Sequence, residues 1–163
     1  MRDDIDEDRI DKVVDLAAPV SRVWQALSDH HEFGEWFRVK LDGPFEPGEV
    51  STGKMTFPDS EGLPWRVVVD RMEPERLFSF RWNLEEAADA ANQQTMPGEF
   101  CLEETAVGTR LTITESGFSA IPESRRIEML RQCDWGWDVQ SRNIAAYITS
   151  GSCAYCDRGR RPL

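Results

Sequence analysis

The stretch GTRLTITESGFSAIPESRRIEMLRQCDWGWDVQSRNIAAYITS, residues 108–150, contains the two patterns that decide the fold. Its first part alternates apolar Leu111 and Ile113 with polar neighbours, which is typical of a strand with one buried face. Pro122 then opens the longest helical pattern of the chain, over residues 123–150. At a rise of ~1.5 Å per residue this helix would be about 40 Å long, enough to cross a small sheet. The apolar residues that follow one side of this helix are Ile127, Leu130, Cys133, Trp137, Ile144 and Ile148.

Short strand-like runs upstream of the long helix predict an antiparallel meander. Apolar and polar residues alternate in them, and the short connections contain turn residues. Before the meander, Ile10, Val14 and Leu16 lie on one face of a predicted first strand, residues 9–16. The acidic, alanine-rich residues 83–97 are compatible with a loop or with a short helix. The predicted strands of the meander are residues 50–57, 65–72, 77–82, 98–104 and 109–116.

Two short helices are predicted between the first strand and the meander. Apolar residues follow Pro19 at steps of three and four within residues 18–27, and Asp29 can cap a second helix that runs to Trp36. The sum is an α+β layout in which the long C-terminal helix buries its apolar side against a curved antiparallel sheet. The space between a strongly curved sheet and one long helix can stay partly unfilled, so the layout also leaves room for a cavity.

The composition is acidic, with 19 Lys and Arg against 30 Asp and Glu and a net charge of −11. Nucleic acid is therefore not expected as a partner. A chain of 163 residues predicts one domain, residues 9–150, with a flexible acidic arm at 1–8 and a flexible tail at 151–163. No run approaches the ~18 apolar residues of a membrane span, and the start has no apolar stretch for a signal peptide. Together with four unevenly spaced cysteines, this predicts a cytoplasmic protein.

Motifs for catalysis or metal binding are sparse. His30, His31 and Glu32 form the histidine cluster, but adjacent residues do not share a helical face, so a solvated helix surface is the preferred interpretation. Cys153 and Cys156 have the spacing of half a zinc site or of a redox pair, yet no second pair completes it, and we expect two exposed thiols. Phosphate-binding glycine patterns, the HExxH motif and the GxSxG elbow are absent from the sequence. No cofactor, metal or catalytic residue is therefore predicted.

An ordered series of segments resembles a known family. Ala18-Pro19-Val20, then Val23-Trp24-Gln25-Ala26-Leu27 and Trp36, resembles the opening of the START-like (SRPBCC, Bet v-like) superfamily, and its closest branch is named after the activator of the heat-shock protein 90 ATPase. The match runs from about Ile10 to Ile148, while residues 83–97 look longer than the usual link and the basic tail lies outside the family pattern. The later matching segments are residues 45–48, 69–82, 108–118 and 136–137.

The resemblance implies a helix-grip fold and three functions. The preferred one is a non-enzymatic module that binds a small hydrophobic ligand between the sheet and the long helix. The alternative is a protein-interaction module that acts on a chaperone, although chaperone stimulation belongs to proteins that couple this domain to another one. The third is a cyclase- or hydrolase-like enzyme, which lacks a placed acid/base pair here.

Seven residues are candidates for the ligand site because the inferred fold places them on the concave face of the sheet or on the facing helix. Each of them can also simply fill the core, so an open pocket and a closed core both remain as alternatives. The candidates are Trp65, Phe80, Trp82, Phe100, Met129, Cys133 and Trp137.

Overall fold

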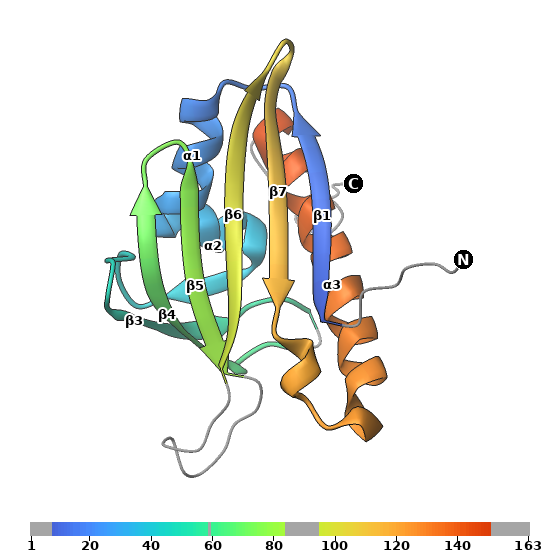
Figure 1. Ribbon diagram of the computed structural model, residues 1–163. Coiled ribbons are helices and arrows are strands. Elements are labelled where there is room, and N and C mark those ends of the chain that lie inside the picture. Colours follow the sequence, from blue (N-terminus) through green and yellow to red (C-terminus); the bar gives the residue numbers. More distant parts are fainter. Residues whose placement is uncertain (1–7, 59, 84–94, 151–163) are drawn as a thin grey trace, which may run out of the picture.

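The computed structural model describes residues 8–58, 60–83 and 95–150 and shows an antiparallel sheet with helices packed on one side (Figure 1). The helices are α1 (Val20–Ser28), α2 (His30–Phe37) and α3 (Glu123–Ser150), with a short 3-10 helix η2 (Phe118–Ala120) before α3. The strands are β1 (Arg9–Leu16), β2 (Val39–Leu41), β3 (Val50–Met55), β4 (Pro64–Glu73), β5 (Leu77–Asn83), β6 (Thr95–Thr105) and β7 (Gly108–Ser116).

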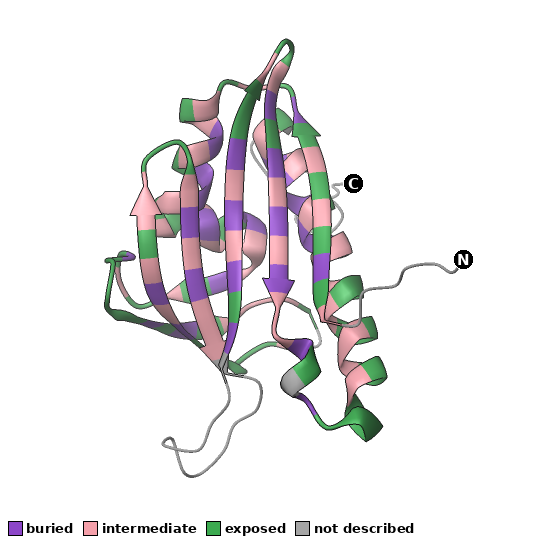
Figure 2. Ribbon diagram, viewed as in Figure 1, coloured by how far each residue is buried: buried purple, intermediate pink, exposed green. Residues whose placement is uncertain are grey.

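The seven strands form one sheet in the order β1-β7-β6-β5-β4-β3-β2, and every neighbouring pair is antiparallel. The first strand thus pairs with the last one, and the sheet edges among the described residues are β1 and β2. Burial alternates along β6 and β7 because successive side chains point to opposite faces (Figure 2). Leu111 and Ile113 are buried on the side of the helices, as their alternation predicts.

The predicted helices are present, and local hydrogen bonds explain their ends. The side chain of Asp29 accepts hydrogen bonds from the backbone N–H groups of His31 and Glu32, so the predicted cap of α2 is confirmed. The helix ends at Arg38, whose backbone is left-handed with φ of 71°. Nε1 of the buried Trp36 donates to the carbonyl oxygen of Ala26 at 2.9 Å, which fixes α2 against α1.

The structure adds details that the sequence patterns did not predict. The three-residue strand β2 pairs with β3 at the sheet edge and was not expected. Within the segment 83–97, Asn83 ends β5 and residues 95–97 begin β6, so these positions are strand rather than loop or helix. Residues 1–7 of the predicted arm 1–8, residues 84–94, and the predicted tail 151–163 with Cys153 and Cys156 lie outside the described residues.

The core has two adjoining parts. The larger part lies under α1, α2 and the end of α3, and includes Leu27, Trp36 and Ile144. The smaller one lies where α3 begins, and Trp82 packs against both. The buried residues of the smaller part are Ile10, Met96, Phe118 and Ile121.

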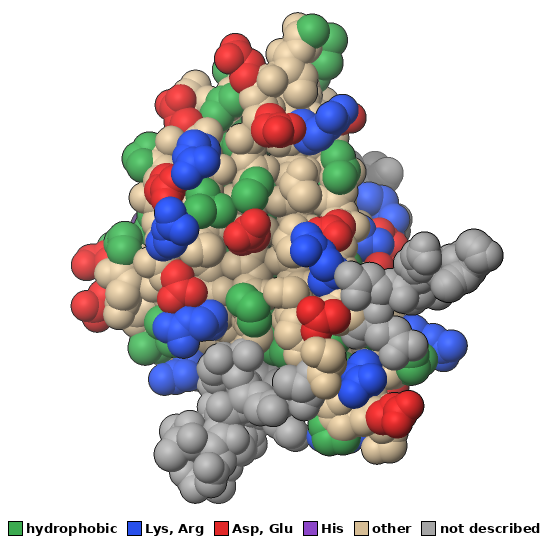
Figure 3. All heavy atoms as spheres, viewed as in Figure 1, with side chains coloured by type: hydrophobic (Ala, Val, Ile, Leu, Met, Phe, Trp, Pro, Cys, Tyr) green, Lys and Arg blue, Asp and Glu red, His purple; other side chains and the backbone are tan. Residues whose placement is uncertain are grey.

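The face of the sheet opposite the helices is polar. Figure 3 shows Lys and Arg interspersed with Asp and Glu over this face, with single hydrophobic side chains scattered among them. Two ion pairs on this face join neighbouring strands: Arg81 with Asp70, and Arg110 with Asp15, each at 3.0 Å. No helix among the described residues is long and apolar enough to cross a membrane.

Candidate functional site

The predicted ligand-site residues meet on the helix side of the sheet. Phe80 on β5 and Phe100 on β6 lie with ring centroids 5.4 Å apart, and Phe100 lies 5.9 Å from Trp137 on α3. Trp65 on β4 joins these rings through α2, since its ring lies 5.1 Å from Phe37. We call Trp65, Phe80, Phe100 and Trp137 the aromatic wall. Met129 and Cys133 on α3 pack against the smaller core, where Trp82 joins them. The seven candidates therefore lie on the helix side of the sheet, where Trp65 contacts α2.

These residues differ in how completely they are covered. Phe80 and Phe100 are buried, with 7% and 1% of their surface exposed. The other five are only partly buried. All three candidates on α3 lie in its N-terminal part, residues 123–138, where no residue is fully buried. The aromatic wall is thus closed at its centre and less tightly covered where α3 begins.

Glu115 lies beside this aromatic wall and was not among the predicted site residues. It follows Leu111 and Ile113 at steps of two, so the alternation that buries them also turns its side chain inward, and only 1% of its surface is exposed. Nε1 of Trp137 donates a hydrogen bond of 2.8 Å to Oε1 of Glu115. The alternation with a period of two could have identified Glu115 as an inward-facing residue. Charged residues are rarely buried, so the alternation was not applied to it.

The environment of Glu115 favours its protonated form. Burial raises the pKa of its carboxyl to about 7, against the lowering effects of Trp137, Trp82 and the Cys133 thiol. Burial and the nearby Glu115 in turn raise the pKa of Cys133 above its usual range, so its thiol stays protonated and is a poor nucleophile. The site therefore contains a carboxyl group, that of Glu115, that can gain or lose a proton near neutral pH among apolar side chains.

Cross-strand pairing explains why the Phe80 ring lies close to the carboxyl of Glu115. Gly98 on β6 pairs with Phe80 on one side and with Glu115 on the other. A Cβ at position 98 would lie 2.8 Å from ring atoms of Phe80, which is closer than carbon atoms can approach. Because glycine has no side chain, the Phe80 ring lies over β6, one strand away from Glu115.

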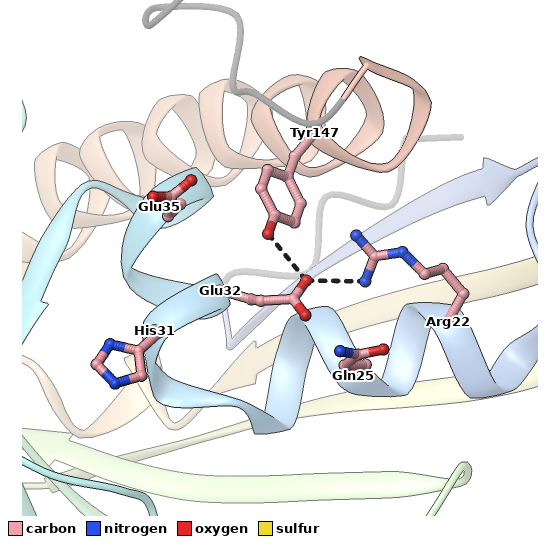
Figure 4. Close-up of a pocket in the computed structure, with 6 residues that line it drawn as sticks. All are labelled: Arg22, Gln25, His31, Glu32, Glu35 and Tyr147. Carbon is pink, nitrogen blue, oxygen red and sulfur yellow. Dashed lines mark hydrogen bonds and ion pairs between the residues drawn. The ribbon is translucent and has the colours of Figure 1, made fainter.

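A polar pocket of about 460 Å³ lies between α1, α2 and the end of α3, away from the aromatic candidates (Figure 4). Oε1 of Glu32 accepts hydrogen bonds from Arg22 Nη1 and from the Tyr147 hydroxyl, both at 2.8 Å. The Arg22 guanidinium also lies 5.5 Å from the centre of the Tyr147 ring. Burial and the nearby Glu32 raise the pKa of Tyr147 to about 12, so its hydroxyl remains a donor. These contacts join three helices, and we interpret the pocket as a structural ion-pair cluster.

The histidine cluster of the sequence lies at the edge of this polar pocket. His31 is exposed and lines it, whereas the neighbouring Glu32 is partly buried and points to Arg22 and Tyr147 (Figure 4). Among the described residues there is no group of three His, Cys, Asp or Glu side chains that could hold a metal ion. The cluster therefore contributes its carboxylate to helix packing.

Comparisons with solved structures agree with the fold. A protein from Arthrobacter aurescens shares 18% identity with a TM-score of 0.72, and the match covers 90% of both chains. The Aha1 dimer from Colwellia psychrerythraea shares 17% identity with a TM-score of 0.67, covering 88% of this chain and 97% of that one. DynU16, a putative protein in the dynemicin biosynthetic locus, shares 26% identity with a TM-score of 0.72. That match covers 90% of this chain and 49% of DynU16.

The family comparison covers most of the chain, although a search of curated protein sequences finds no match. Residues 17–149 match the family described as Activator of Hsp90 ATPase homolog 1-like protein. This range includes the described helices, apart from the last residue of α3, and six of the seven strands, all except β1. With its curved antiparallel sheet and long C-terminal helix, the chain belongs to this family and has the START-like helix-grip fold.

Proposed function

We propose that this domain binds a small, flat hydrophobic ligand between the sheet and the N-terminal part of α3. The observation that carries the proposal is the uneven cover of the aromatic wall. Trp82, Cys133 and Trp137 retain solvent exposure where α3 begins, while Phe80 and Phe100 form a buried floor. A ligand inserted there would complete the burial of these side chains.

A ligand of moderate size could reach useful affinity at such a site. At ~25 cal/mol per Å² of apolar area removed from water, a few hundred Å² would support micromolar affinity after the entropy of binding is subtracted.

Two tryptophans on α3 provide a matched test. Trp137 points inward to Glu115, whereas Trp135 is 59% exposed. Calorimetric titration with a panel of aromatic and fatty ligands should give micromolar binding of a flat aromatic ligand. Trp137→Ala should change the affinity and the preference among ligands, and Trp135→Ala should leave both unchanged. If the wild type binds nothing and Trp137→Ala costs roughly 3 to 5 kcal/mol of stability, the wall is a closed core and the proposal is wrong.

A second candidate, docking on a chaperone ATPase, is favoured by the exposed apolar residues Ile127 and Trp135 of α3 and by the description of the family. The net charge of −11 would favour a basic patch on such a partner. We expect no stimulation of a heat-shock-90-type ATPase by this chain at micromolar concentration. A several-fold increase in ATP turnover that weakens with salt and is lost in Trp135→Ala would support docking instead.

A further inference from the structure

The two edges of the sheet differ in length. The edge strand β2 has three residues, whereas β1 has eight and pairs on one side only, with β7, among the described residues. Figure 1 shows β1 at the margin of the sheet with α3 behind it. A long edge strand presents a row of backbone N–H and C=O groups to which another extended strand can bind. The edge at β1 is therefore a candidate interaction surface.

Exposed apolar side chains flank this edge. Val13, on the outward face of β1, is 59% exposed. Asp134 and Asp138 of α3 contact β1, so their side of the helix lies along the edge. Ile127 precedes Asp134 by two turns and Trp135 lies three residues before Asp138, which places both close to this side of α3. Thus three of the six large apolar residues that are exposed in the described part of the chain lie beside β1.

The charges of β1 select one register for pairing with a second copy of the chain. The odd-numbered residues of β1 face outward, as its burial pattern shows. Residues opposite each other in a continuous sheet share a face, so the two longest antiparallel registers of β1 with itself pair residues 9–15 or residues 10–16. The first places Arg9 opposite Asp15 at both ends, which is attractive. The second places Asp11 opposite Asp15, which is repulsive.

We propose that two copies of this chain pair antiparallel along β1, about a two-fold axis at Lys12, and so join their sheets into one. Lys12 points inward at this edge, and a bare charge there would discourage pairing. Its Nζ lies 2.8 Å from Asp134 and 2.9 Å from Asp138, so its charge is already compensated. The net charge of −11 on each chain opposes association, so we expect a reversible dimer of micromolar affinity.

Charge reversal tests the register. Arg9→Asp and Asp15→Arg each place like charges opposite each other, so each variant alone should dimerise about tenfold more weakly than the wild type in sedimentation velocity. An equimolar mixture of the two variants restores opposite charges at both pairs. Native mass spectrometry of the mixture should therefore show the heterodimer in preference to either homodimer. The ion pairs that Arg9 and Asp15 make within one chain, with Asp11 and Arg110, give no such preference.

Val13 provides a second test because the proposed register places it opposite Asp11 of the second copy. Val13→Asp should weaken the dimer. Val50→Asp, at a 47% exposed position of β3 near the other edge of the sheet, is the control and should leave the dimer unchanged.

Three results would overturn the proposal. They are a wild-type protein that stays monomeric throughout the micromolar range, a dimer that Arg9→Asp and Val13→Asp leave intact, and a mixture of the charge-reversal variants with no preferred heterodimer. All of these measurements are made without a ligand, so their outcome does not depend on the proposed ligand-binding function.

Discussion

The two parts of α3 differ in how the rest of the molecule holds them. In residues 139–150 the helix buries Val139, Ile144 and Tyr147, and Gln140 Nε2 donates to the carbonyl oxygen of Phe37 at 3.0 Å. In residues 123–138 no residue is fully buried, and contacts with the rest of the protein include ion pairs of Lys12. One continuous helix therefore has a fixed end and a loosely covered end. The loosely covered end carries Trp137, which donates a hydrogen bond to the buried Glu115.

The largest expected difference between the two parts is in hydrophobic packing. Ile144 is completely buried in the C-terminal part, and Ile127 is 45% exposed in the N-terminal part. Ile144→Ala should lower the free energy of unfolding by about 2 to 5 kcal/mol, because it leaves a cavity in the core. Ile127→Ala should change it by less than about 0.5 kcal/mol. Urea unfolding measures both, and equal losses would contradict the comparison.

The next effect is a pH dependence that originates at Glu115. The pKa of this carboxyl is about 7 in the folded protein against an ordinary value of 4.5, so between these pH values the folded state binds more protons than the unfolded state. Its contribution to stability is complete below about pH 4.5 and is lost as the pH rises through about 7, a change of roughly 3 kcal/mol.

Glu115→Gln tests this dependence because glutamine has the same shape and does not titrate. The variant should lose less stability than the wild type in urea unfolding between pH 5 and pH 8. Glu104→Gln, at an exposed position of β6, serves as the control and should follow the wild-type curve. If wild type and Glu115→Gln show parallel curves, Glu115 does not carry a proton that is linked to folding.

A smaller difference is expected for the polar contacts of the two parts. Tyr147→Phe removes the hydrogen bond to Glu32 at a partly buried site and should cost about 1.5 kcal/mol. Lys12→Met removes ion pairs to Asp134 and Asp138, whose side chains are 52% and 46% exposed, and should cost less than about 1 kcal/mol. Thermal unfolding of the two variants checks the order. A larger loss for Lys12→Met would mean that ion pairs hold the N-terminal part firmly.

Much of the fold follows from periodicity in the sequence. Ile10 and Leu16 alternate with outward Asp11 and Asp15 on β1, and the apolar steps after residue 123 give a helix of the predicted length. The strand β2 was missed because three residues are too few to show a period, and it forms only by pairing with β3.

The candidate site was predictable only in part. Its aromatic residues could be placed by alternation on the strands, because the inward face of each strand is a local property. Glu115 obeys the same alternation, but a carboxylate is rarely buried, so its charge favoured an outward position. The cluster of Arg22, Glu32 and Tyr147 could not be derived from the sequence, since it requires knowing how three separate helices meet.

The most direct test of the central claim is amide hydrogen exchange measured with and without a saturating flat aromatic ligand, naphthalene being the probe. Without ligand, residues 123–138 should exchange faster than residues 139–149, because fewer buried contacts oppose their opening. With ligand, the account predicts that exchange slows in residues 123–138 and in β5 near Trp82, and changes little in residues 139–149. Slowing that is confined to α1, α2 and residues 139–149, around the polar pocket of Figure 4, would contradict it.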